Sequence, residues 1–321
     1  MKLLHLARET LRQARRGTPL AIAGAATVLA LTTASPRALA AESNYTPNYT
    51  HFAWQEVASG VWFGTTQPNS FQTGNTVIIA LPGKGSMVVD SHNSEYLGRE
   101  IIDKAKQVAP GPVLYLVNTH LHQDHVGGNA AFRKAFPKIE IIAHRNTCWG
   151  ITEKTMPRMS ARIASLTQGL EGMRKKRADL PEGDKEAAAL DRRIAGTALY
   201  LDDAKQFDWV LPTQCADMKP GAMRAIVAGG RRVEIRYFGG GHTAGDLVVY
   251  LPKEKIVAVG DLWSENGDLL LDSGLDGRDG SVLAAPATLR GISKLDFDKA
   301  LPRSEEHTSE LQSHHDLVCR L

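Results

Sequence analysis

Cysteine is scarce in this chain: only three of its 321 residues are cysteines, and no two of them form a C-x-x-C pair. The sequence therefore excludes a thiol-rich zinc site and a C-x-x-C redox motif. It also lacks a Gly-x-Ser-x-Gly turn, the motif that presents a serine nucleophile at the end of a strand. Catalytic chemistry must therefore be sought among other side chains.

Long apolar runs are absent as well. The longest, Leu20–Leu31, is interrupted by Gly24 and Thr27, and a membrane-spanning helix needs about 20 apolar residues. Five basic residues precede this run, and Ala38-Leu39-Ala40 follows it. This order predicts a signal peptide over 1–40 and a periplasmic or secreted protein with no stable membrane anchor. The pair Arg15-Arg16 hints at twin-arginine export, but the residues after it fit poorly, so the export route stays open.

The C-terminal residues 303–321 read RSEEHTSELQSHHDLVCRL and show no hydrophobic periodicity. Written as codons, RSEEHTSELQS matches a widely used sequencing-adapter oligonucleotide, and HDLVCRL fits the downstream part of that adapter. We therefore interpret 303–321 as adapter read-through and not as native protein. Its histidines, His307, His314 and His315, are excluded from the search for ligands.

A strong net charge is lacking once both ends are set aside. The whole chain has a formal charge of +3, but residues 1–40 carry six basic and one acidic residue, and 303–321 carry two basic and four acidic. The remaining residues 41–302 are therefore neutral overall. This balance gives no support for a nucleic-acid partner.

The apolar patterns of residues 41–302 predict an α/β domain. Strands are expected at 57–63, 76–81, 87–89, 113–118 and 139–143, with helices at 95–108 and 129–136 between them. Four further strands are expected at 222–228, 232–237, 246–251 and 255–259. Such alternation favours layers of helix and sheet.

Residues 146–209 follow a different pattern. Apolar residues recur at steps of three and four on both sides of the turn signal Pro181–Asp184, which predicts a helical hairpin inserted in the domain. The insert is interpreted as a lid over a site, a dimer contact, or decoration packed on the sheet.

The most informative stretch is 113–128, VLYLVNTHLHQDHVGG. An apolar, β-branched run ends at Asn118, and His120, His122, Asp124 and His125 follow within six residues. Side chains two apart on an extended segment share a face, so His120 and His122 point to one side. Imidazoles and a carboxylate at the end of a buried strand are typical metal ligands.

The H-x-H-x-D-H pattern followed by Gly-Gly resembles the signature of the metallo-β-lactamase fold superfamily. The resemblance covers roughly 54–302 and implies an αββα sandwich of the metallo-β-lactamase type with an inserted helical hairpin. Two later motifs, GGGHT at 239–243 and Gly260-Asp261, resemble further ligand motifs of the superfamily.

Matched to that pattern, three histidines would hold one ion: His120, His122 and His242. Asp124 and His125 would hold a second ion, and Asp261 would bridge the two. Asp124 would also act in catalysis by orienting the attacking water and relaying a proton. Two zinc ions per chain are the first expectation, and iron or manganese suits the same ligands.

The resemblance implies a metal-dependent hydrolase that attacks an ester, lactone, thioester or related bond of a small-molecule substrate with metal-activated water. One alternative is a β-lactamase similar to subclass B3, although Asp261 weighs against it because lactamases usually carry cysteine or serine there. Another is an oxygenase resembling the mononuclear iron persulfide dioxygenases. Two zincs per chain would support hydrolysis, and one redox-active iron the oxygenase.

Two features are left undecided by the sequence. Cys148 and Cys215 could pair in an oxidising compartment, but their spacing does not decide it. Asp90, which ends the apolar run 87–89, is either a strand-end turn residue or a partner that orients a ligand imidazole.

One ligand of the superfamily pattern is missing. A Pro-Gly-His-Gly segment commonly supplies the last imidazole, but here Pro302 is followed by the adapter-like residues. We expect this copy to have an incomplete second metal site. The uninterrupted genomic reading frame should continue past Pro302 with a histidine within a few residues, and a continuation without one would refute this prediction.

Overall fold

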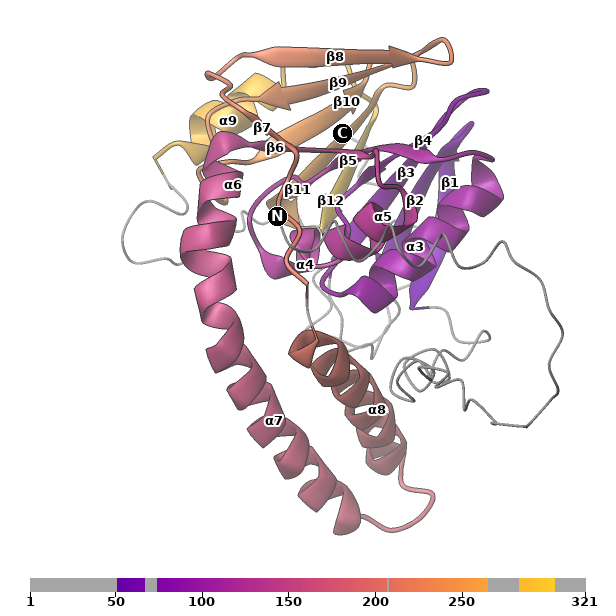
Figure 1. Ribbon diagram of the computed structural model, residues 1–321, viewed down its shortest axis with the longest axis vertical. Helices are drawn as coiled ribbons and strands as arrows, with labels where there is room; N and C mark the ends of the chain where they lie inside the picture. The colour runs from indigo at the N-terminus through magenta and orange to yellow at the C-terminus, as the bar shows by residue number, and fades with distance from the viewer. Residues whose placement is uncertain (1–50, 67–73, 207, 265–282, 304–321) are drawn as a thin grey trace, which may run out of the picture. The chain divides into compact units, whose positions relative to one another are not determined.

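The computed structural model describes residues 51–66, 74–206, 208–264 and 283–303. The predicted signal peptide at 1–40 lies outside the described residues, as does all of the adapter-like tail except Arg303. The strands of the described part form two sheets, which are covered on their outer faces by helices (Figure 1).

The first sheet has seven strands in the order of the chain. It consists of β1 (Phe52–Ala58), β2 (Val61–Thr66), β3 (Asn75–Leu81), β4 (Gly85–Val89), β5 (Val113–Val117), β6 (Glu140–His144) and β7 (Gln214–Ala216). Strands β1 to β4 are antiparallel, and β4 to β7 are parallel. The carboxyl ends of the parallel strands therefore meet at one edge, and the His120 loop leaves the sheet there.

The second sheet has the order β12-β11-β10-β9-β8. Its strands are β8 (Met223–Ala228), β9 (Arg231–Tyr237), β10 (Leu247–Leu251), β11 (Ile256–Ser264) and β12 (Lys299–Arg303). All neighbours are antiparallel except β11 and β12, which are parallel. Both sheets are therefore mixed.

Alternating side chains hold the layers together. Ile78 and Leu116 face α3 (Glu95–Val108) and α5 (Asn129–Ala135), where they pack against residues such as Phe132. Their strand neighbours, such as Ile79, face the other way and pack on the second sheet. The outer face of that sheet packs on α9 (Ala285–Ile292). The predicted αββα sandwich is confirmed.

Residues 145–205 form the predicted helical insert. It comprises α6 (Arg145–Gly150), a π-helical turn (Ile151–Thr155), α7 (Met156–Ala178) and α8 (Lys185–Lys205), and α7 and α8 form an antiparallel hairpin (Figure 1). Asp184 caps α8 by accepting a hydrogen bond from the backbone N–H of Glu186 at 2.6 Å. None of the described helices is long and apolar enough to cross a lipid bilayer.

The expected single strand at 57–63 is wrong. The chain instead turns at Ser59-Gly60 and forms two antiparallel strands, β1 and β2. Gly60 has a φ of 69°, a left-handed conformation that glycine adopts without steric cost, so this residue ends the strand. The sequence analysis also missed β12, which contains Pro302. As an edge strand, β12 tolerates the proline.

The structure joins the two cysteines whose pairing was left open. Cys148 in α6 and Cys215 in β7 form a disulfide, with their Cα atoms 6.0 Å apart. Strand β7 has only three residues and lies at the edge of its sheet. The disulfide therefore attaches this short edge strand to the start of the helical insert.

Replacing both cysteines with serine is expected to lower the free energy of unfolding by about 2–4 kcal/mol, because a crosslink of this span restricts the unfolded chain. Urea denaturation of the oxidised wild type and the double variant measures the difference. A reductant should destabilise the wild type and leave the double variant unchanged. If the reductant left the free energy of unfolding of the wild type unchanged, the disulfide would be contradicted.

Candidate metal centre

The loop that follows β5 brings two histidines to the edge of the first sheet. After Val117 the chain leaves the sheet, passes His120 and His122, and begins the short helix α4 (Gln123–Val126). The backbone carbonyl of Thr119 accepts a hydrogen bond from the N–H of Leu247 in β10 at 2.8 Å. The ligand loop is thus attached directly to the second sheet.

The second sheet contributes His242 and Asp261. His242 lies in the loop between β9 and β10, and Asp261 lies within β11. The adjacent Gly260 has a φ of 56°, and a Cβ at this position would lie 2.8 Å from Oγ1 of Thr119. Only glycine lets β11 approach the histidine loop this closely.

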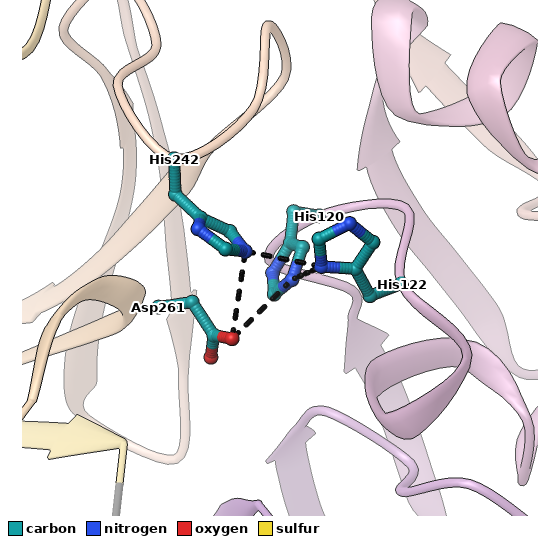
Figure 2. Close-up of side chains that lie close together, drawn as sticks. All are labelled: His120, His122, His242 and Asp261. Atoms are coloured by element: carbon teal, nitrogen blue, oxygen red, sulfur yellow. Dashed lines mark hydrogen bonds and ion pairs between the residues drawn. The ribbon is translucent and has the colours of Figure 1, made fainter. Parts of the chain in front are cut away.

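Four side chains from these segments converge (Figure 2). Nδ1 of His122 lies 3.0 Å from Nε2 of both His120 and His242. Oδ2 of Asp261 lies 3.8 Å from Nε2 of His120 and 3.5 Å from Nε2 of His242. Their four ligand atoms all lie within 4.8 Å of one another, a spacing compatible with one shared metal ion.

These four residues form the first group of candidate ligands. The second group consists of Asp124 and His125 and shares Asp261 with the first. Nε2 of His125 lies 3.0 Å from Oδ1 of Asp261 and 3.7 Å from Oδ2 of Asp124. The two oxygens of Asp261 therefore face different groups of ligand atoms. The structure brings together all six residues that the sequence analysis selected.

Asp90 combines both interpretations that the sequence left open. It follows β4 with a φ of 63°, as a turn residue does, and its Oδ2 lies 2.7 Å from Nδ1 of His125. The same carboxylate accepts hydrogen bonds from the backbone N–H of Thr119 at 2.7 Å and from its hydroxyl at 2.8 Å. Asp90 therefore orients the His125 imidazole and fixes the loop that carries His120.

The charges of the two groups favour a bound cation. Burial lowers the pKa of His120 well below its usual value, and the nearby His125 lowers it further, which favours the neutral, metal-binding imidazole. For His125 burial also lowers the pKa, but the carboxylates of Asp261, Asp90 and Asp124 outweigh burial and raise it well above its usual value. The second group thus carries an excess of negative charge.

The residues present fit a metal ion. Nε2 of His125 and Oδ1 of Asp261 are both buried and lie 3.0 Å apart. A cation shared by these two atoms would satisfy both. The donors are imidazole and carboxylate without thiolate, a set suited to zinc and also to iron or manganese.

The second group has fewer ligand residues than the first in the described part of the chain. Pro302 of β12 lines a small cavity of about 20 Å³ together with Asp90, His125 and Asp261. Its carbonyl accepts a hydrogen bond from Nδ2 of Asn75 at 2.6 Å. The end of β12 is therefore held next to the second group.

The sequence analysis missed one residue that supports the loop of His242. Asp246 accepts hydrogen bonds from the backbone N–H of Thr243 at 2.9 Å and from its hydroxyl at 2.6 Å, and so fixes the loop of His242. Burial raises the pKa of Asp246 to about 7 despite these bonds. The Thr243 hydroxyl also accepts a hydrogen bond from the backbone N–H of Gly245 at 3.2 Å, two residues on, a turn that a threonine in a glycine-rich loop could have indicated.

A family model of the metallo-beta-lactamase superfamily matches residues 70–198. The metallo-beta-lactamase FIM-1 from Pseudomonas aeruginosa, in its mono-zinc form, is similar with a TM-score of 0.54 and 16% identity, over 80% of this chain and 89% of that chain. A metallo-beta-lactamase from Hirschia baltica has a TM-score of 0.53 and 17% identity, over 80% and 92%. No curated protein matches this chain.

The matched segment includes the strand and loop that carry four of the six selected residues. At these identities the solved structures establish the fold, and the histidine–aspartate cluster lies where its two sheets meet. The chain therefore has the metallo-beta-lactamase fold, and its residues 70–198 match the model of the metallo-beta-lactamase superfamily.

Proposed function

We propose that this chain is an exported metal-dependent hydrolase that cleaves an ester, lactone or thioester bond of a small molecule and uses two zinc ions. One ion would be held by His120, His122 and His242, a second by Asp124 and His125, and Asp261 would bridge them. The observation that carries this proposal is the orientation of Asp261, whose Oδ2 faces two histidines of the first group while its Oδ1 faces His125.

Zinc, when bound, supplies a Lewis acid for the scissile carbonyl and lowers the pKa of water toward 7. The protein side chains position the reactants. Asp124 is the most accessible carboxylate of the cluster, with 18% of its side chain exposed compared with 0% for Asp261. We assign it the catalytic role of orienting the attacking water and passing a proton to the leaving group.

The carboxylate at position 261 favours this reaction over β-lactam hydrolysis. In the resemblance drawn from the sequence, lactamases usually carry cysteine or serine at that position. The similar solved structures are named as metallo-beta-lactamases, so a β-lactam belongs in any substrate panel.

An oxidising compartment is proposed on two grounds. The N-terminal residues have the pattern of a signal peptide, and the chain contains a disulfide between Cys148 and Cys215. Disulfides persist mainly in secreted and periplasmic proteins. We therefore place the hydrolase in the periplasm or outside the cell.

Zinc-loaded protein is expected to hydrolyse at least one substrate in a panel of a lactone, a thioester, a carboxylic ester, a phosphodiester and a β-lactam. His242→Ala should lower the rate about a thousandfold, because a lost ligand removes several kcal/mol of transition-state stabilisation. His51→Ala is the matched control, since His51 is buried against Glu100 outside the cluster. Its rate per folded, zinc-loaded molecule should stay within about threefold of the wild type, although the loss of the partner of buried Glu100 lowers its stability.

Metal analysis of the same samples separates the alternatives. We expect one tightly bound zinc in the present chain and a second, weaker one that His125→Ala abolishes. Turnover of the β-lactam alone would favour a β-lactamase. A single redox-active iron without hydrolysis would favour an oxygenase.

Asp90→Asn is expected to weaken zinc binding about 10- to 100-fold, because the amide no longer presents two acceptor oxygens to Thr119 and His125. Competition with a chromogenic chelator measures the affinity. Asp203→Asn is the control, since this carboxylate accepts a hydrogen bond from the backbone of Glu95 and touches no cluster residue. Equal zinc affinity in both variants would contradict the orienting role of Asp90.

A further inference from the structure

A cavity of about 180 Å³ opens beside the metal centre. Its floor includes His122 and Asp124 of the ligand loop, and its wall includes Arg158 and Arg162 of α7. The helical insert therefore contributes two guanidinium groups to the space from which a substrate would reach the metal ligands.

The two arginines lie on one side of α7, because residues four apart in a helix are neighbours on its surface. Both are exposed, and no carboxylate of the described residues forms an ion pair with either of them. Farther along the hairpin, two of the basic residues are paired: Lys176 with Glu186 at 2.5 Å, and Arg177 with Asp191 at 2.8 Å. Arg162 also hydrogen-bonds to the neutral side chain of Tyr200, so both guanidinium groups keep their positive charge beside the metal centre.

Hydrogen bonds fix this part of α7 relative to the metal ligands. The hydroxyl of Thr155 donates to the carbonyl of Leu121, between the two ligand histidines, at 2.7 Å. Nε2 of Gln123, next to His122, donates to the hydroxyl of Tyr200 in α8. The guanidinium of Arg162 lies 6.0 Å from the centre of the Tyr200 ring. The arginines are therefore carried by a helix that is attached to the ligand loop.

We propose that Arg158 and Arg162 bind a carboxylate of the substrate, so that the hydrolase acts on molecules that carry an acidic group near the scissile bond. This inference rests on the proposed function, since it identifies the residues that bind the acidic group of the same substrate. Guanidinium groups match the geometry of a carboxylate through paired hydrogen bonds. A neighbouring metal centre would hold the reacting carbonyl while the arginines select the acid.

Binding of simple acids to the zinc-loaded chain tests this inference. Each of succinate, glutarate and adipate is compared by calorimetry with the monocarboxylate of equal chain length: butyrate, valerate and hexanoate. At least one dicarboxylate should bind about tenfold more tightly than its partner, because its second carboxylate reaches the arginines. In Arg158→Gln/Arg162→Gln this preference should fall below about twofold.

A matched variant removes the same charge elsewhere on α7. Arg174→Gln/Lys175→Gln replaces two exposed basic residues that line no part of the cavity, and it should keep the full preference for the dicarboxylate. Zinc content and thermal melting of both variants should equal those of the wild type. Equal binding of both acid series by the wild type, or a preference that survives in Arg158→Gln/Arg162→Gln, would overturn the inference.

The two proposals fail differently. If the wild type binds zinc and hydrolyses a neutral ester such as 4-nitrophenyl butyrate but shows no dicarboxylate preference, only the arginine assignment is wrong. If the wild type binds no zinc at the cluster, the proposed function fails, and the assignment of the arginines fails with it.

Discussion

The close approach of β11 to the loop after β5 is the constraint on which the metal centre depends. Gly260 lies against Thr119 where a side chain would clash, and the next residue, Asp261, therefore enters between the three histidines of the first group and His125 of the second. Each sheet alone carries only part of the ligand set. The packing of the two sheets is what assembles it, so the core of the sandwich and the site are parts of one arrangement.

This arrangement also concentrates acidic groups in a buried space. Asp90, Asp124 and Asp261 all act on His125, and burial alone would make ionised carboxylates costly there. A divalent cation held between the groups would offset that cost. The same reasoning explains why Asp90 fixes both Thr119 and His125: a bound ion tolerates little displacement of its ligands.

The sequence predicted the local chemistry better than the tertiary contacts. Three histidines and an aspartate in six residues, directly after a buried strand, identified the ligand loop because strand periodicity and ligand spacing are local properties. His242 and Asp261 were selected through the resemblance to a known family, because no local sequence pattern predicts that their segments lie next to His120. The turn at Gly60 was missed because apolar residues continue on both sides of it, and β12 because its pairing with β11 depends on the whole second sheet. Arg158 and Arg162 were not selected because only the folded structure shows that they line the cavity beside the ligand loop.

The base of the helical insert is attached to the ligand loop through Thr155 and Tyr200, so a displacement of the insert would also move the loop that carries His120 and His122. The central claim, a metal ion between the two sheets, is tested most directly by anomalous X-ray diffraction at the zinc edge from zinc-soaked crystals. The account predicts a strong peak within bonding distance of Nε2 of His120, Nδ1 of His122 and Nε2 of His242. A peak elsewhere, or no peak in a crystal with these side chains ordered, would contradict it.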